Sequence, residues 1–231
     1  MSKKINTKLT KLIKYYSLIN HNLIFNNIAI NRYQKNQPKV NEEKVLDLKK
    51  LKSKIIEIKD CKLKENASKI VFSDGNPNSK IMIIGEGPGA NEDKEGLPFV
   101  GRAGQLLDKM LNAINLNRNN VYITNVVNYR PPDNRKPTEG EIMRYLPFLN
   151  KHIEIIKPKI ILLLGSTAMR AIINSEEVIS KIRGKWHEIN INKLKVLAMV
   201  SFHPAYLLRQ PDQKKFSWID LKMIREKLKS L

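Results

Sequence analysis

Cysteine is almost absent from this sequence, since Cys61 is the single one among 231 residues. A disulfide requires two thiols, and a metal site built from cysteine alone requires about four, so one chain can form neither. Secreted domains are often held together by paired cysteines. The scarcity of cysteine therefore predicts a protein of a reducing compartment.

Long hydrophobic runs are also missing. No uninterrupted apolar stretch reaches the roughly 20 residues that a membrane-spanning helix needs. The N-terminus has no compact apolar segment followed by a cleavage site of small residues, as a secretory signal would have. We therefore expect a cytoplasmic protein, a monomer without a membrane partner, whose length suits one α/β domain.

Acidic residues are few relative to basic ones, because 22 Asp and Glu face 42 Lys and Arg and the formal charge is +20. Such an excess suits a polyanionic partner, and for DNA it would place the protein at the nucleoid. Ten of the basic residues are arginines, and lysine is abundant throughout the chain. A merely soluble basic surface is therefore the alternative interpretation.

The first 40 residues differ from the rest of the chain. Apolar side chains recur there at helical spacing, for example at Leu9, Leu12 and Ile13, and a polar stretch follows. We predict a basic N-terminal helical extension and linker over residues 1–40. Residues 41–231 would form the main domain.

The main domain alternates short apolar runs with longer amphipathic ones, a pattern typical of a sheet covered by helices. The apolar runs predict four strands, at 80–85, 121–127, 160–165 and 195–202. The amphipathic runs predict helices at 45–58, 104–114, 139–156 and 165–173. Because the strands are apolar throughout, we predict a three-layer α/β/α sandwich with a central, mostly parallel four-stranded sheet.

A polar or glycine-rich string follows each predicted strand. The four strings are GEGPGANED, NVVNYRPPDNR, GSTAM and HPAYLLR. In a parallel sheet the carboxyl ends of the strands share one edge, and ligands bind in the crevice outside that edge. We therefore expect the four strings to form one site.

Three glycines in the first string, Gly85, Gly87 and Gly89, allow two interpretations. They would cradle a phosphate, or they would let the backbone approach a flat ligand closely. A dinucleotide-binding turn opens directly into a helix, whereas the segment ANEDKEGLP that follows looks too polar and too close to a proline for one. We favour the flat ligand, with Gly85 and Gly87 as substrate-binding residues.

Carboxylates and an aromatic residue follow these glycines. Acidic loops are usually just solvated, yet Glu86, Glu92, Asp93 and Glu95 stand in a very basic chain. Carboxylates weaken the binding of a polyanion, so they favour a catalytic role beside a developing positive charge. Phe99 is either a core residue or a platform on which an extruded base stacks.

Asn125 and His203 each stand at the end of a predicted strand. Asn125 either caps the turn or binds the edge of a pyrimidine, since an amide offers a donor and an acceptor side by side. His203 is either structural or a donor to a developing oxyanion.

The last string suggests how DNA would be held. Leu207 or Leu208 would enter the base stack while Arg209 contacts phosphate, although a helix start within the core is the alternative. Three further cations lie in the second string and are candidates for phosphate contacts: Arg130, Arg135 and Lys136.

Together these residues describe a pocket that flips a base and cleaves its glycosidic bond. The segments GEGPGANEDKEGLPFVGRAGQLLDKML, TNVVNYRPPDNRKPT, ILLLGSTA and SFHPAYLLRQP resemble the successive motifs of the family-four uracil-DNA glycosylases. The resemblance covers about residues 55–225, with the motifs in the same order and spacing. Four linked motifs make a chance similarity a poor explanation.

The resemblance implies an α/β/α sandwich that removes uracil from single- or double-stranded DNA, with no cofactor in the chemical step. Carried over by motif, Asn125 would bind the uracil edge, Phe99 would stack on its face and His203 would stabilise the departing anion at O2. Glu92 would act on water or on the sugar cation, and Glu86 would shape or brace the pocket.

The chain departs from the family at the iron–sulfur site. Members of the family normally carry four cysteines that hold a 4Fe-4S cluster. Cys61 keeps one of these positions, while Ile58, Tyr129 and Tyr145 stand at the other three. We therefore expect an enzyme without the cluster and without any bound metal.

A catalytically inactive nucleic-acid-binding protein on the same scaffold is the alternative function. The intact set of Glu92, Phe99, Asn125 and His203 favours the enzyme.

Overall fold

The computed structural model describes residues 10–11, 14–15 and 42–231. The chain divides into two units between residues 39 and 40, and the second unit is described below. The predicted helical extension and linker of residues 1–40 lie outside the described residues, except for residues 10–11 and 14–15, which are helical.

The described unit is built on one sheet of six strands in the order β1-β3-β2-β4-β6-β5. The strands are β1 (Asp74–Gly75), β2 (Ile81–Gly85), β3 (Val121–Asn125), β4 (Ile160–Leu164), β5 (Trp186–Ile191) and β6 (Leu194–Ser201). The four central strands β3, β2, β4 and β6 are parallel, which confirms the four predicted strands. The edge strands β1 and β5 are antiparallel to their neighbours, so the predicted count of four was too low.

Strand β5 was missed because its sequence, WHEINI, is polar at several positions. Its burial is partial and uneven, with buried side chains at Ile189 and Ile191. It pairs with β6 through a tight hairpin in which Asn192 adopts a positive φ of 52°. An edge strand with one solvated face carries a weaker apolar signal than a central strand.

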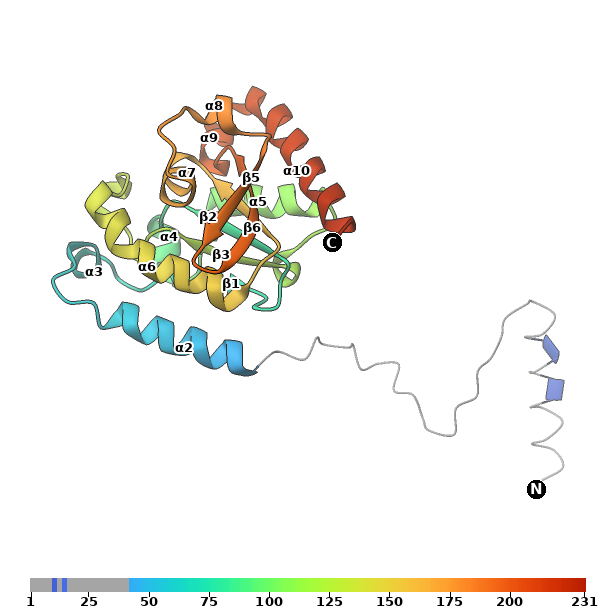
Figure 1. Cartoon of the computed structure of the whole chain (residues 1–231), viewed down its shortest axis with the longest axis horizontal. Coiled ribbons are helices and arrows are strands. Elements are labelled where there is room, and N and C mark those ends of the chain that lie inside the picture. The colour runs from blue at the N-terminus through green and yellow to red at the C-terminus, as the bar shows by residue number, and fades with distance from the viewer. Residues whose placement is uncertain (1–9, 12–13, 16–41) are drawn as a thin grey trace, which may run out of the picture. The chain divides into compact units, whose positions relative to one another are not determined.

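Nine α-helices accompany the sheet in residues 42–231 (Figure 1). They are α2 (Glu42–Ile56), α3 (Lys62–Asn66), α4 (Ala90–Glu95), α5 (Arg102–Asn112), α6 (Glu139–Ile156), α7 (Ser166–Ile173), α8 (Ile179–Ile182), α9 (Pro204–Arg209) and α10 (Lys214–Lys229). Helices α2, α5, α6 and α7 confirm the four predicted helices to within three residues at each end. Helix α10 was not predicted.

Alternation along the strands divides the core into two halves. Met82 and Ile84 pack on one face of β2 with side chains of α2, α6 and α7. Ile81 and Ile83 pack on the other face with side chains of α5, α9 and α10. Successive side chains of a strand point to opposite faces, so helices on both faces make three layers. The predicted α/β/α sandwich is confirmed.

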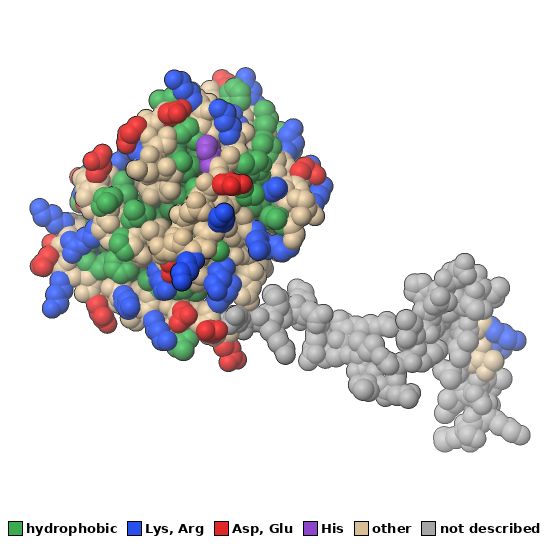
Figure 2. Space-filling view, in the orientation of Figure 1, with side chains coloured by type: hydrophobic (Ala, Val, Ile, Leu, Met, Phe, Trp, Pro, Cys, Tyr) green, Lys and Arg blue, Asp and Glu red, His purple; other side chains and the backbone are tan. Residues whose placement is uncertain are grey.

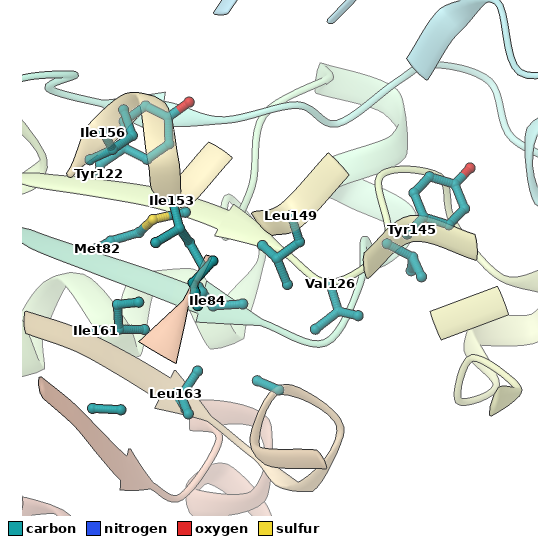
Figure 3. Close-up of a cluster of buried hydrophobic side chains, with 14 of the residues drawn as sticks. Met82, Ile84, Tyr122, Val126, Tyr145, Leu149, Ile153, Ile156, Ile161 and Leu163 are labelled. Carbon is teal, nitrogen blue, oxygen red and sulfur yellow. The ribbon is translucent and has the colours of Figure 1, made fainter. Parts of the chain in front are cut away.

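The first of these halves is shown in Figure 3. Ile84, Ile161 and Leu163 of the sheet lie against Leu149 and Ile153 of α6. All five are essentially inaccessible to water. Burying each such side chain stabilises the fold by about 1.5–3 kcal/mol, which fixes α6 on the sheet and thereby the loop before it.

Helix α4 corrects the expectation that no helix follows the glycine-rich turn. The backbone N–H of Gly89 donates to the Glu92 side chain at 3.1 Å, which caps the helix start. Asp93 is buried and accepts from the N–H groups of residues 68–69 at 2.9 and 3.2 Å. The carboxylates of Glu92 and Asp93 therefore stabilise this polar helix by accepting hydrogen bonds from backbone N–H groups. The Glu92 carboxylate occupies its N-terminus, where a phosphate would otherwise bind.

No helix within residues 42–231 or the four described N-terminal residues combines the length and apolarity needed to span a bilayer.

His152 of α6 is fully buried between aromatic side chains of the core. Its ring centroid lies 4.4 Å from that of Phe72 and 5.8 Å from that of Tyr122, and its Nε2 has no hydrogen-bond partner. Burial lowers the pKa of His152 to about 3. The folded protein therefore keeps this ring neutral at physiological pH.

The buried His152 predicts a loss of stability in mild acid. The unfolded chain binds a proton near pH 6.5 and the folded chain does not until about pH 3, so the free energy of unfolding falls as pH drops below 6.5. Between pH 7 and pH 5 we expect His152 to cost about 2 kcal/mol of stability. Urea unfolding at several pH values measures it. The variant His152→Leu should lose this part of the slope, and an unchanged slope would contradict the assignment.

Candidate functional site

Three of the four predicted strings, those that follow β2, β3 and β6, meet at one cavity of about 170 Å³. This volume is below that of a site for a drug-sized ligand and suits one small ring. Seven of the predicted site residues line it: Glu86, Gly87, Glu92, Phe99, Asn125, Arg135 and His203. They come from the end of β3 and from the segments that follow β2, β3 and β6, and the parallel strands bring them to one edge of the sheet. The predicted third string, GSTAM after β4, supplies none of the lining residues.

The floor of the cavity depends on the pairing of β2 with β3. Gly85 and Asn125 are the last residues of the two strands and lie opposite each other. A Cβ on Gly85 would lie 2.4 Å from Asn125 Oδ1 and 2.5 Å from Cζ of Phe99. Glycine is thus required here so that the amide and the ring can approach each other. The Asn125 side chain is 3% exposed, and its amide has no hydrogen-bond partner among the described residues.

Phe99 forms one wall of the cavity in an unusual backbone conformation. Its φ is 55°, in the left-handed region that few residues other than glycine adopt. Its ring is stacked with the ring of His203 at a centroid distance of 5.6 Å and an angle of 29°. An aromatic face and an imidazole therefore share the space beside the Asn125 amide.

Glu92 holds the loop that carries Phe99. Its Oε1 accepts the backbone N–H of Val100 at 3.0 Å and that of Gly101 at 2.8 Å, while Oε2 accepts that of Gly89. The carboxylate is therefore fixed in position at the rim of the cavity. The sequence motif predicts a chemical role for Glu92. It does not indicate this structural role, which depends on partners up to nine residues away.

Glu86 is oriented by a residue that sequence analysis did not assign. Its Oε2 accepts the hydroxyl of Thr167 at 2.5 Å. Thr167 is buried in the first turn of α7, within the string GSTAM that was expected to reach the site. Glu86 lines the cavity, and its Oε1 has no hydrogen-bond partner among the described residues.

The ring of His203 has a defined tautomer. Its Nδ1 accepts the backbone N–H of Ala205 at 3.1 Å, where His203 caps the start of α9. The proton of the neutral ring is therefore on Nε2. Burial and the positive charge of Arg209 lower the pKa of His203 to about 4, against the opposite effect of Glu92. At neutral pH the site thus contains a neutral imidazole that donates one hydrogen bond.

The two leucines predicted to enter the base stack, Leu207 and Leu208, differ in their exposure to solvent. Leu207 is 0% exposed and packs in the core with α5 and α10, so its predicted entry into a base stack is wrong for this conformation. Leu208 is 38% exposed on the same helix, and Arg209 beside it is also exposed. A residue that is already buried in the core cannot also enter a duplex.

Two of the three cations of the second string, Arg130 and Arg135, have side-chain partners within the protein. Arg135 forms a bidentate ion pair with Glu141 beside the N-terminal cap of α6. Its Nη1 donates to Oε2 at 2.8 Å and its Nη2 donates to Oε1 at 2.7 Å. Arg130 donates to the side chain of Asn134 at 2.9 Å, and Asn134 lines the cavity. Lys136 is exposed. Figure 2 shows lysine and arginine side chains spread over the visible face rather than gathered in one patch.

The four residues that the resemblance aligns with iron–sulfur ligands, Ile58, Cys61, Tyr129 and Tyr145, belong to the same core cluster or pack against it. Cys61 Sγ and Tyr145 Oη are hydrogen-bonded at 3.3 Å, and burial and the neighbouring thiol raise the pKa of the Tyr145 hydroxyl. Burial and Cys61 also raise the pKa of Tyr129, while Ile58 packs against the same core. A cluster requires about four thiolates or close substitutes. One thiol, two phenols that stay protonated and an aliphatic side chain do not fit it.

Comparison with known proteins places the chain among glycosylases. The model of the family described as the uracil DNA glycosylase superfamily matches residues 72–225. A type-4 uracil-DNA glycosylase of Sulfurisphaera tokodaii is 43% identical over 173 residues, which are 73% of this chain and 79% of the relative. One of Thermotoga maritima is 44% identical over 64% of this chain and 77% of the relative. A type-5 enzyme of Pyrobaculum aerophilum is 28% identical over 58% of this chain and 64% of the relative.

The His203 geometry predicts a titration that NMR can follow. We expect the Nε2–H tautomer and a neutral ring down to about pH 5, because the pKa is about 4. Replacing Arg209 by Gln removes a nearby positive charge and should raise this pKa. The matched control, Arg225→Gln, removes the same charge from the second half of α10 and should leave the pKa unchanged. Equal shifts in both variants would contradict the local interaction.

Proposed function

The chain belongs to the uracil DNA glycosylase superfamily and, within it, to the type-4 enzymes, and we propose that it flips uracil out of DNA and hydrolyses its N-glycosidic bond. The product would be an abasic site. One observation carries this proposal: an unpartnered amide, an aromatic face and an imidazole with its proton on Nε2 share a cavity the size of one small ring. We further propose that the protein works as a monomer in the cytoplasm, at the nucleoid.

Binding would begin with phosphate contacts that are sensitive to salt and independent of sequence. Arg209 and Lys136 are exposed and suited to this, and the wider excess of basic residues would steer DNA toward the domain. Leu208 would then fill the space that the extruded nucleotide leaves in the stack. Extrusion costs a few kcal/mol and is easiest at a weak U·G pair or in a single strand, so we propose action on both forms of DNA.

The Asn125 amide would select uracil by hydrogen bonds to its edge. Its NH₂ group would donate to O4 and its Oδ1 would accept N3–H. Cytosine carries an amine at C4 and an acceptor at N3. The NH₂ group of Asn125 would therefore face another donor, and its Oδ1 would face another acceptor. Leaving a buried amide without hydrogen-bond partners costs more free energy than leaving a solvated amide without them. The discrimination of uracil from cytosine is therefore strong.

Cleavage would move the electron pair of the glycosidic bond onto N1 of uracil and leave an oxocarbenium-like sugar. His203 would donate its Nε2–H to O2 of the uracil anion. A neutral donor suffices here, because it stabilises the charge without having to transfer its proton.

Two carboxylates would act on the sugar side. Glu92 is held by three backbone N–H groups and would provide a fixed negative charge opposite the sugar cation. Glu86 keeps Oε1 unengaged and would orient the water whose oxygen bonds to C1′. The water proton would leave through this carboxylate.

The assay for this function uses purified protein and a uracil-containing oligonucleotide, single- or double-stranded, with alkaline scission of the abasic product. We expect scission with uracil and none with cytosine. Replacing Asn125 by Ala should lower the single-turnover rate by about 100-fold or more, because the edge contacts are lost. Binding to DNA without uracil should stay within about twofold, since phosphate contacts dominate it.

The outcomes separate enzyme from binding protein. Wild-type protein that binds DNA but never releases uracil would support the inactive alternative. Equal losses of rate and of nonspecific binding in Asn125→Ala would exclude Asn125 from base recognition.

We also propose that the enzyme carries no 4Fe-4S cluster. Protein purified without oxygen should contain far less than one iron atom per chain and lack the broad visible absorption of a cluster. The matched variant Ile58→Cys/Tyr129→Cys/Tyr145→Cys restores four thiols with Cys61 and should gain iron. Stoichiometric iron in the wild type would overturn the proposal.

A further inference from the structure

The segment 98–101, which carries Phe99, has a backbone conformation that is unfavourable by itself and needs contacts to stabilise it. A residue other than glycine with φ near +55° costs about 1–3 kcal/mol relative to ordinary backbone. Such a conformation persists where the surroundings over-determine it. On the C-terminal side, Glu92 accepts the N–H groups of Val100 and Gly101. These two hydrogen bonds do not involve Pro98 or Phe99 on the N-terminal side of the segment.

Arg118 holds the other side of the segment. Its Nη1 donates to the carbonyl of Pro98 at 3.1 Å, and its Nη2 donates to the carbonyl of Phe99. Arg118 lies in the 3-10 turn Arg118–Asn120 before β3 and does not line the cavity. A cation thus binds the two carbonyls before the bend, and an anion binds the two N–H groups after it.

The guanidinium is itself held in one orientation. Arg118 Nη1 lies 2.6 Å from Asp74 on β1, and its Nε lies 2.9 Å from Asp108 on α5. Its side chain is 25% exposed, so the pairs are partly shielded from water. A planar fork with five donors can satisfy two carboxylates and two carbonyls at once, whereas a lysine has three donors on a flexible stem.

The Phe99 carbonyl has little freedom to move toward α5. A Cβ on Gly104 would lie 1.6 Å from this oxygen, so the carbonyl sits directly against the helix backbone. With α5 on one side and Arg118 on the other, a carbonyl released by Arg118 can shift by rotating the Phe99 peptide. That rotation would turn the ring that lines the cavity.

We propose that Arg118 is a positioning residue for the aromatic platform, which it controls from outside the cavity by fixing the Phe99 carbonyl. The part of this inference that concerns uracil affinity rests on the proposed function. The part that concerns the ring does not.

The test compares Arg118→Gln with a matched control, Arg144→Gln. Arg144 on α6 also donates to two successive carbonyls, those of Lys59 and Asp60, and Asp60 also has a positive φ, of 50°. The two substitutions remove the same kind of contact, and Arg144 belongs to the helix layer on the other face of the sheet.

The first measurement is independent of activity. The Phe99 ring is stacked with the ring of His203, so it shifts the NMR resonances of that imidazole. Arg118→Gln should change these shifts and Arg144→Gln should not. If Arg118→Gln leaves them unchanged, the proposal is overturned whatever the protein does to DNA.

The second measurement is inhibition of the wild type and variants by free uracil. We expect about tenfold weaker inhibition in Arg118→Gln, because a small displacement of a platform has effects of this order or larger, and no change in Arg144→Gln. In a Phe99→Ala background the substitution of Arg118 should have no further effect, since the two act through one ring. Additive losses would show that Arg118 acts elsewhere. If free uracil does not inhibit the wild-type protein, the proposed function alone is contradicted, because the NMR test still decides the positioning role of Arg118.

Discussion

The short segment 98–101 is held between opposite charges, and the cavity depends on this arrangement. Glu92 binds its N–H groups and Arg118 binds its carbonyls, so a residue with a costly backbone conformation is fixed from both sides. The Phe99 ring can then stack with His203 and approach Asn125 over Gly85, where no side chain larger than hydrogen fits. The wall and floor of the cavity therefore follow from ionic contacts to backbone, in addition to apolar packing.

Charge is divided between the surface and the site. The chain carries a formal charge of +20, yet the cavity holds two carboxylates and a histidine that burial and Arg209 keep neutral. This division suits a reaction on a polyanion. In the proposed reaction, a basic exterior would raise the encounter rate with DNA. The carboxylates of the cavity would stabilise a cationic sugar, and neutral His203 would donate a hydrogen bond to the departing anion. Arg135, although basic and at the rim, is paired with Glu141, so part of the positive charge serves the fold.

The side chains around Cys61 pack as part of the core. A thiol–phenol hydrogen bond joins Cys61 to Tyr145, and Tyr145 packs with the side chains of α6 and the sheet (Figure 3). Burial raises the pKa of both phenols, Tyr129 and Tyr145, which favours their neutral, protonated form. This side-chain packing links the segment before α3 to α6.

The sequence by itself determined the central sheet, the main helices and seven of the residues that line the cavity. Apolar runs and helical periodicity are local signals, and Asn125, Phe99 and His203 belong to motifs that follow strands. Tertiary structure decided the features whose partners are distant in the chain. Helix α4 forms from polar residues because Glu92 and Asp93 bind backbone groups outside or at the end of it. Leu207 is buried because α5 and α10 cover it, and no pattern distinguishes it from Leu208. Arg118 and Thr167 reach the site residues Phe99 and Glu86 across 19 and 81 positions, a relation that sequence order does not encode and only the packed fold creates.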